Sequence, residues 1–233
     1  MATKKVAPKA EENKDALEGM NEALSRSEQF IEKNQNTLLI ALAAVIVVVG
    51  GILLYNNKVV LPKEQKAAEM IFVGEQYFAA DSLDKALYGD DDVDYIGFEE
   101  IAKKYAATKT GKLAKAYAGL CYKEKGEYET AVSYLSKANT SSLVAGPAFV
   151  GALGDCYVEL GQVQKAASCF DKAAKTDNNL LAPIYLMKAG RAYESLGQWS
   201  KALAAYETIK AQYPSSLEGS EIEKYIERAK LQK

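Results

Sequence analysis

The longest uninterrupted hydrophobic segment of the chain runs from Leu38 to Leu54, where every residue is apolar or glycine. No charged residue falls between Lys33 and Lys58. Thr37 and Tyr55 extend the uncharged segment by one residue on each side. A helix of about 20 residues spans a hydrocarbon core roughly 30 Å thick. The pattern predicts a single transmembrane helix over residues 36–57.

Two alternative interpretations of this segment fit less well. A core helix of a soluble domain rarely stays apolar on every face for about five turns. A cleaved signal peptide usually has an apolar run of about 7–15 residues after a short basic region. Here a long polar segment with seven acids comes first. An uncleaved anchor is therefore the preferred interpretation.

Residues 1–35 are predicted to form a polar N-terminal tail that contains an amphipathic helix. Its apolar stripe is spaced by 3, 4, 3 and 4 residues, as expected for one helix face. The stripe consists of Leu17, Met20, Leu24, Ser27 and Ile31. Because two heptads are too few to establish a coiled coil, three roles remain open. They are a solvated helix, a helix on the membrane surface and a helix that docks on a partner.

Beyond Pro62 the hydrophobic spacing is helical, and one pattern returns three times. It reads AGLCYKEKGEYETAVSYLSKA from Ala118, LGDCYVELGQVQKAASCFDKA from Leu153 and AGRAYESLGQWSKALAAYETI from Ala189. Each copy has a glycine, a tyrosine, an alanine and a bulky residue at matching positions. These are Gly119, Gly154 and Gly190; Tyr122, Tyr157 and Tyr193; Ala131, Ala166 and Ala202; and Leu135, Phe170 and Tyr206.

Helix packing explains this choice of residues. Glycine and alanine let two helices approach closely, and the tyrosine and the bulky residue fill the space between them. A second set of glycines, Gly126, Gly161 and Gly197, is expected at the turn between the two helices, where a left-handed conformation is needed. The pattern resembles the tetratricopeptide repeat (TPR). The resemblance implies an all-α solenoid with three clear repeats over residues 111–214.

A degenerate repeat is predicted before them, over residues 58–110. Gly74, Tyr77 and Ala86 keep the internal offsets of the clear repeats, but about ten additional residues follow, around Tyr88 to Phe98. The three aspartates of this insertion, Asp90–Asp92, lack the alternating ligands of a calcium-binding EF-hand loop. We therefore expect a solvated acidic loop.

A capping helix is predicted over residues 215–233. Pro214 precedes it, and Ser215 or Ser216 is suited to its first position. Leu217, Ile222, Ile226 and Ala229 are expected on its inner side. A solenoid needs such a cap because its last repeat would otherwise expose an apolar flank.

Composition narrows the function. The 29 basic and 31 acidic residues nearly balance, so no nucleic-acid surface is indicated. The chain has no histidine, the commonest general base and metal ligand. We expect no enzyme, no cofactor and no metal site. Cys121, Cys156 and Cys169 are interpreted as buried thiols, with a disulfide between Cys156 and Cys169 as the alternative.

The TPR resemblance also implies a concave groove lined by the first helix of each repeat. Its expected residues are Leu113, Ala116, Leu120, Lys123 and Glu124; Ala148, Gly151, Asp155, Val158 and Glu159; and Ile184, Met187, Arg191, Glu194 and Ser195. The subfamily that clamps carboxylates has Lys and Asn where Ala116 and Leu120 stand, so that activity is not implied. These residues predict a groove with a small apolar floor and a lip of mixed charge. Asp155 and Arg191 are expected either to pair with each other or to contact opposite charges on a ligand. A spacer role without a ligand is the alternative.

From about Phe30 to the C-terminus the architecture resembles the bacterial YfgM-like family of single-pass inner-membrane proteins. This resemblance implies a periplasmic TPR domain, and partners among the SecYEG translocon, a membrane-anchored prolyl isomerase and exported proteins. The alternative is a cytoplasm-facing TPR scaffold for another membrane or envelope assembly. Charge leaves the orientation open. Close to the anchor, two basic residues precede it and three follow it, whereas the whole tail has six.

Overall fold

The computed structural model describes residues 9–138, 142 and 144–232, and the side chains from Phe30 onward except that of residue 32. It divides into two compact units, Met1–Lys58 and Val59–Lys233. The described residues contain no β-strand, only an isolated bridge between Asp90 and Tyr95. The predicted all-α fold is confirmed.

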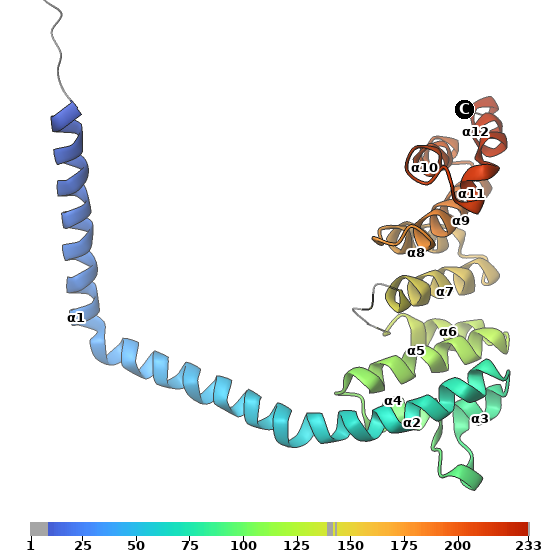
Figure 1. The fold of residues 1–233 in the computed structure, drawn as a ribbon, viewed down its shortest axis with the longest axis horizontal. Coiled ribbons are helices and arrows are strands. Elements are labelled where there is room, and N and C mark those ends of the chain that lie inside the picture. The colour runs from blue at the N-terminus through green and yellow to red at the C-terminus, as the bar shows by residue number, and fades with distance from the viewer. Residues whose placement is uncertain (1–8, 139–141, 143, 233) are drawn as a thin grey trace, which may run out of the picture. The chain divides into compact units, whose positions relative to one another are not determined.

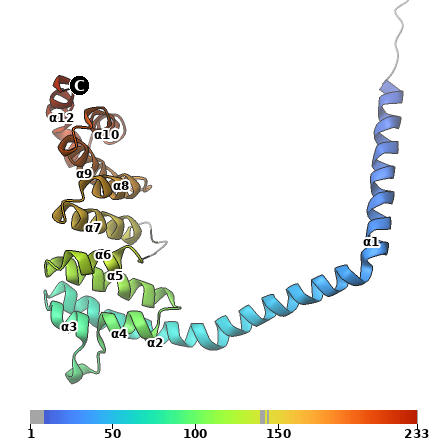
Figure 2. The same ribbon diagram turned by 180° about the vertical axis from the view of Figure 1, so that it is seen from behind.

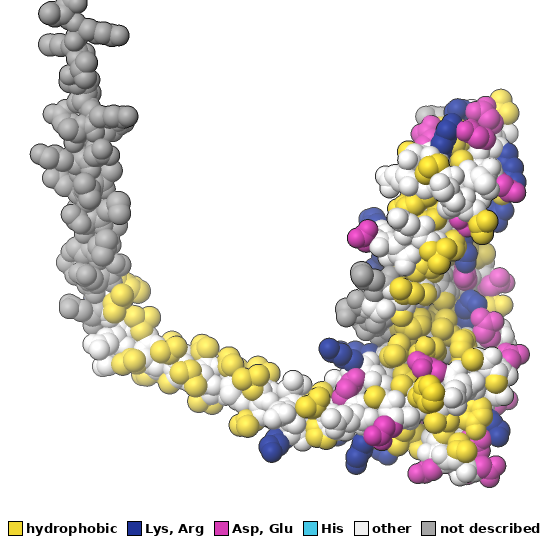
Figure 3. Space-filling view, viewed as in Figure 1, with side chains coloured by type: hydrophobic (Ala, Val, Ile, Leu, Met, Phe, Trp, Pro, Cys, Tyr) yellow, Lys and Arg dark blue, Asp and Glu magenta, His cyan; other side chains and the backbone are white. Residues whose placement is uncertain are grey.

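The first unit is one long helix, α1 (Lys9–Tyr55), coloured blue in Figure 1. Its apolar stretch is exposed along its length, as Figure 3 shows, and Val47 near the centre is 73% exposed. Among the described helices, one is long and apolar enough to cross a membrane, judged by length and composition. Of the predicted amphipathic stripe, only the side chain of Ile31 is described, and it is exposed. A π-helical turn, Asn56–Val60, follows α1.

The second unit is a stack of helices, seen from two sides in Figures 1 and 2. In chain order they are α2 (Leu61–Ala79), α3 (Leu83–Tyr88), α4 (Gly97–Lys104), α5 (Lys109–Glu124), α6 (Tyr128–Leu135), α7 (Ala145–Glu159), α8 (Val163–Ala174), α9 (Leu181–Ser195), α10 (Trp199–Gln212), α11 (Leu217–Ser220) and α12 (Ile222–Leu231). The pairs α5/α6, α7/α8 and α9/α10 are the three clear repeats. Each pair packs against the next, which confirms the predicted solenoid.

The repeat glycines lie where two helices almost touch. A β-carbon built on Gly154 would lie 2.6 Å from the Phe170 ring, and one built on Gly190 would lie 2.3 Å from the Tyr206 ring. Gly119 meets Leu135 in the same way, at 2.7 Å. The turn glycines Gly126, Gly161 and Gly197 have φ values of +78°, +68° and +68°. Both glycine sets therefore have the packing and turn roles that the sequence pattern predicts.

The first, degenerate repeat has a divided second helix. In the second clear repeat the bulky residue that packs on the glycine Gly154 is Phe170, on α8. In the degenerate repeat the aromatic ring that packs on Gly74 is that of Phe98. Phe98 follows Gly74 by 24 residues, whereas Phe170 follows Gly154 by 16, so Phe98 comes eight positions later. Because Phe98 belongs to α4, the helices α3 and α4 together take the place of one second helix. The residues between them form the insertion.

The insertion is not a purely solvated loop. The Asp90 carboxylate accepts hydrogen bonds from the Tyr77 hydroxyl at 2.5 Å and from the Lys85 ammonium at 2.7 Å. The hydrogen bonds from Lys85 and then Tyr77 lower the pKa of Asp90 to about 2. Asp91 and Asp92 are exposed, as expected. For Asp90 the expectation was wrong, because this carboxylate ties the insertion to α2 and α3.

The C-terminal cap is broken into α11 and α12. The Ser216 hydroxyl accepts a hydrogen bond from the Gly219 amide at 2.9 Å and so caps α11. Ile222, Ile226 and Ala229 are buried, as predicted, but Leu217 is 87% exposed. The prediction for Leu217 was wrong because the helix is interrupted between it and Ile222, which removes the common face.

All three cysteines are free thiols. Cys121 and Cys156 are buried in the core, and Cys169 is half-buried. Burial raises the pKa of Cys121 to about 12 and that of Cys156 to about 11. These thiols act as small apolar core residues, and Cys156 and Cys169 form no disulfide in this structure.

Candidate functional site

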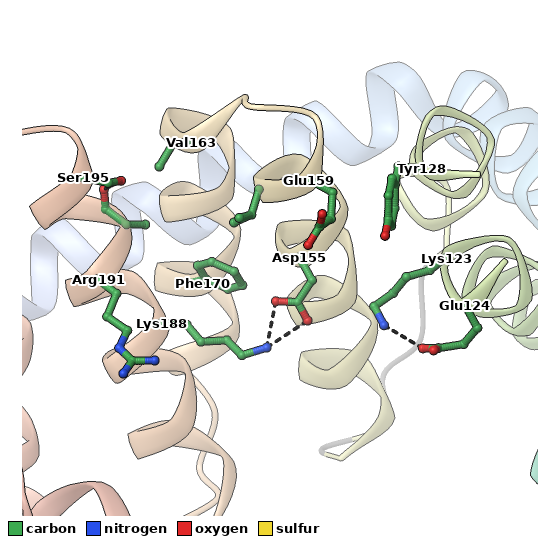
Figure 4. Close-up of a pocket in the computed structure, with 12 residues that line it drawn as sticks. Lys123, Glu124, Tyr128, Asp155, Glu159, Val163, Phe170, Lys188, Arg191 and Ser195 are labelled. Carbon is green, nitrogen blue, oxygen red and sulfur yellow. Dashed lines mark hydrogen bonds and ion pairs between the residues drawn. The ribbon is translucent and has the colours of Figure 1, made fainter. Parts of the chain in front are cut away.

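A cleft of the solenoid has a volume of about 700 Å³ and is lined by consecutive repeats. The first helices α5, α7 and α9 contribute most of its side chains, and the second helices α6 and α8 the remainder. The lining consists of Lys123, Glu124, Tyr128, Asp155, Val158, Glu159, Val163, Phe170, Lys188, Arg191, Ala192 and Ser195. Figure 4 shows this cleft.

Two ion pairs neutralise charges within the cleft. The Lys188 ammonium lies 2.7 and 2.9 Å from the two carboxylate oxygens of Asp155, which connects α9 to α7 (Figure 4). The same ammonium lies 5.6 Å from the centroid of the Phe170 ring. Lys123 contacts Glu124 at 2.7 Å. Each of these charges therefore has a partner before any ligand arrives.

Arg191 is different, because within the described residues it has no carboxylate partner. Its Nη2 donates a hydrogen bond to the Tyr225 hydroxyl at 3.0 Å, and its guanidinium lies 5.6 Å from the centroid of the same ring. Tyr225 belongs to α12, so the cap holds this arginine in place. The remaining guanidinium donors are available to a ligand.

The predicted pairing option between Asp155 and Arg191 was wrong. Lys188 lies one turn before Arg191 on α9 and reaches α7, whereas Arg191 contacts α12. Glu194, also on α9, binds Arg228 of α12 through contacts of 3.1 and 2.6 Å. One helix therefore directs its charges to two different neighbours.

Known sequence patterns match most of the clear repeats. Two family models, each described as tetratricopeptide repeat, match residues 114–142 and residues 152–216. The chain contains tetratricopeptide repeats. No curated protein matches it. The first match covers much of α5 and all of α6, and the second covers the second half of α7 and all of α8, α9 and α10. Tetratricopeptide repeats are modules for protein–protein interaction, and the cleft lies within the matched helices.

Four of the nine residues predicted to form the partner groove line the cleft of these repeats: Lys123, Asp155, Glu159 and Arg191. Of the wider set, Glu124, Val158 and Ser195 line it as well. Glu124, Glu159 and Ser195 are equivalent in the three repeats. Among the predicted groove positions, this is the one whose residue lines the cleft in all three repeats.

The remaining five predicted groove residues are engaged elsewhere. Ala116 is 1% exposed, and a β-carbon on Gly151 would lie 2.1 Å from the Tyr185 ring. Both residues pack one helix against another, so their assignment to an exposed groove floor was wrong. Leu120 and Met187 are half-buried against the hydrophobic core. Glu194 is engaged with Arg228.

Five lining residues were not predicted from the repeat pattern: Tyr128, Val163, Phe170, Lys188 and Ala192. Tyr128 and Val163 each come two residues after a turn glycine, so the repeat alignment contained a signal for them. Lys188 comes three residues before Arg191, which places it one turn away. Phe170 was assigned to packing alone, yet one side of its ring also lines the cleft.

The lining of the cleft offers apolar and charged groups that a ligand can contact. Within the described part of the chain, no group of three His, Cys, Asp or Glu residues is placed to hold a metal ion. The lining combines apolar surface from Tyr128, Val158 and Val163 with charged groups such as Asp155, Lys188 and Arg191. Val158 is 43% exposed, so this apolar surface is open to a ligand.

Proposed function

We propose that this protein is a membrane-anchored, non-catalytic adaptor that binds a segment of another protein in the cleft of its tetratricopeptide repeats. The observation that carries the proposal is the combination of two features in one chain. One is a cleft lined by three successive repeats. The other is a helix long and apolar enough to cross a membrane. The helix would concentrate the repeats, and any partner they bind, at the membrane.

The lining indicates the kind of segment that fits. The apolar side chains of the lining suit the apolar residues of an extended or helical peptide. The preformed pairs of Lys188 with Asp155 and of Lys123 with Glu124 leave little net charge there. Arg191 and Glu159, which lack ion-pair partners among the described residues, offer one positive and one negative contact. Charge selectivity would therefore arise at these two positions.

The architectural resemblance to the YfgM-like family supports a more specific role. In this proposal the anchor lies in a bacterial inner membrane and the repeats face the periplasm. The protein is then an ancillary subunit of the SecYEG translocon and the periplasmic chaperone network. Its partners are translocon subunits, a membrane-anchored prolyl isomerase or exported proteins. No cofactor is required.

A cytoplasm-facing scaffold for another membrane or envelope assembly is the second candidate. The observation in its favour is the local charge pattern. Lys58, Lys63 and Lys66 follow the apolar segment closely, against two basic residues at a similar distance before it. Basic residues close to an anchor favour the cytoplasmic side.

Site-specific crosslinking in intact cells tests the binding proposal. A photoreactive amino acid is placed at Val158 or Ser195 in the cleft, and at Lys172 on α8 as an exposed control outside the cleft lining. We expect defined protein adducts from the two cleft positions and none from the control. The identity of the adducts then tests the translocon assignment. Identical adducts from all three positions would contradict binding in the cleft.

Orientation is tested separately with Lys175→Cys in a chain whose native cysteines are replaced by serine or alanine. A membrane-impermeant maleimide should label this exposed position in intact cells if the repeats are periplasmic. Labelling only after lysis would favour the cytoplasm-facing scaffold.

A further inference from the structure

The first turn of α2 is bound to the beginning of α5 by one carboxylate. Glu64 accepts hydrogen bonds from the amides of Lys109 and Thr110, at 2.7 and 3.1 Å, and from the Thr110 hydroxyl at 2.7 Å. Burial opposes ionisation of this carboxyl, but the hydrogen bonds from Thr110 and Lys109 outweigh it and lower its pKa. Glu64 therefore stays ionised and faces the amides at the start of α5.

This contact brings four lysines to one end of the solenoid. Lys63 and Lys66 flank Glu64 on α2, and Lys109 and Lys112 occupy the first turn of α5. All four are exposed, and none has an ion-pair partner among the described residues. Figure 3 shows Lys and Arg side chains at the beginning of α2 and of α5. We name these four residues the basic end.

The acids near the basic end do not cancel its charge. Glu64 is occupied by the amides of α5, and Glu69 is the next acid along α2. Four lysines against these two carboxylates leave a net charge of +2. Glu64 also cannot turn outward to pair with a lysine without exposing the α5 amides that it satisfies.

Few residues separate the apolar segment of α1 from the basic end along the chain. Lys63 follows Leu54 by nine residues. Even a fully extended connection of this length reaches only about 30 Å, and a helical one about 14 Å. If Leu38–Leu54 spans a bilayer, the headgroups on the exit side begin within this reach. Electrostatic attraction to them extends over a Debye length of about 8 Å at physiological ionic strength.

We infer that the basic end binds the headgroups of anionic lipids and so holds the first repeat against the membrane surface. The inference rests on the membrane anchoring of the proposed function and adds a second, electrostatic attachment to it. Each lysine near an anionic surface strengthens binding by about fivefold, equivalent to about 1 kcal/mol. Through the Glu64 contact, binding at this end would restrain α2 and α5 together.

Lipid selectivity of the full chain tests this inference. The protein is reconstituted into phosphatidylcholine nanodiscs with spin-labelled phosphatidylglycerol or spin-labelled phosphatidylcholine, and the motionally restricted fraction of each is measured. We expect the wild type to prefer phosphatidylglycerol at low salt and to lose this preference at high salt. This preference for phosphatidylglycerol should fall at least about fivefold in the variant that combines Lys63→Gln, Lys66→Gln, Lys109→Gln and Lys112→Gln. These substitutions keep the contact between Glu64 and the start of α5, because Glu64 binds the backbone amide of Lys109 and not its side chain.

A matched control removes the same number of charges elsewhere, through Lys137→Gln, Lys165→Gln, Lys172→Gln and Lys175→Gln. It should keep the wild-type preference. An equal loss in both variants, or no preference in the wild type, would overturn the inference. Competition with salts gives a further test. If inorganic phosphate displaces more spin-labelled lipid than chloride does at the same ionic strength, the basic end is a site for free phosphate, and the inference is overturned.

Alkaline carbonate extraction of membranes from cells that express the wild type reports on the anchor independently. Extraction of the protein would overturn the membrane-anchored function together with this inference. Retention in the membrane without phosphatidylglycerol preference would overturn the inference alone.

Discussion

The hydroxyl of Tyr193 on α9 donates a hydrogen bond to the carboxylate of Asp171 on α8 and so joins the third clear repeat to the second. An equivalent bond of 2.6 Å runs from Tyr122 to Glu99 on α4. Asp171 follows Phe170 and Glu99 follows Phe98, so both carboxylates come directly after the aromatic ring that packs on the repeat glycine. The bond therefore identifies α4 as the second half of a repeat helix. Between the first and second clear repeats, the residue at the position of Asp171 and Glu99 is Ser136, which has no carboxylate. The hydroxyl of Tyr157 accordingly forms no equivalent hydrogen bond within the described residues.

The first prediction concerns this bond. Tyr193→Phe should lower the free energy of unfolding by about 1 kcal/mol, because a part-buried hydroxyl and its charged acceptor lose their contact. Tyr157→Phe is the matched control and should change stability by less than about 0.5 kcal/mol. Thermal unfolding of the full chain in detergent measures both. Equal losses would show that the hydrogen bond from Tyr193 to Asp171 does not stabilise the fold.

Acid should weaken the insertion through Asp90. The pKa of this carboxyl is lowered from 3.8 to about 2 by Lys85 and Tyr77. Because the folded state binds this proton less tightly than the unfolded state, the contribution is full above pH 3.8 and is lost as the pH falls through about 2. Asp90→Asn should therefore be less stable than the wild type near neutrality. The difference in melting temperature should shrink over this pH window, and a difference independent of pH would contradict the assignment.

Gly154→Leu should destabilise the solenoid because its side chain would enter the space of the Phe170 ring. A β-carbon alone would lie 2.6 Å from that ring. Overpacking of this kind costs about 1–3 kcal/mol. Lys172→Ala, at an exposed position of α8, should cost less than about 0.5 kcal/mol. Chemical denaturation of the two variants compares them, and equal midpoints would mean that the repeat register is incorrect.

Val47→Arg tests the anchor. An arginine near the centre of a transmembrane helix opposes insertion by about 2.5–3.5 kcal/mol. We expect part of this variant to move from the membrane fraction to the soluble fraction after cell fractionation. Val93→Arg places the same charge on an exposed valine of the insertion and should remain in the membrane fraction. An unchanged distribution of both variants would argue against Leu38–Leu54 as the spanning segment.

Arg191→Gln tests the charged end of the cleft. The arginine is exposed, and the substitution removes its hydrogen bond to the Tyr225 hydroxyl, so stability should fall by only about 0.5–1.5 kcal/mol. Crosslinking of a partner from Ser195, one turn away, should nevertheless decrease if the partner presents an acidic group to Arg191. Lys201→Gln, on α10 and outside the cleft lining, serves as the control. Undiminished crosslinking would remove Arg191 from the binding surface.

The repeats themselves could be predicted because their determinants are local. Gly154 and Phe170 belong to successive helices, and the turn glycine Gly161 lies between them, so one helical hairpin contains the whole packing unit. Such contacts depend on helix periodicity and on a single left-handed turn, both of which are written in the order of residues. The apolar segment before the repeats is equally local, since length and composition alone qualify it to span a membrane.

Tertiary packing decided what lies between the hairpins. Phe98 replaces the expected bulky residue only because the insertion folds back and brings α4 onto Gly74. Lys188 rather than Arg191 binds Asp155 because the two residues face different neighbouring helices. Ala116 and Gly151 occupy groove positions by sequence, yet the close approach of successive repeats buries them. The order of residues determined each hairpin, and the packing of each hairpin against the next determined which faces remained open to a partner.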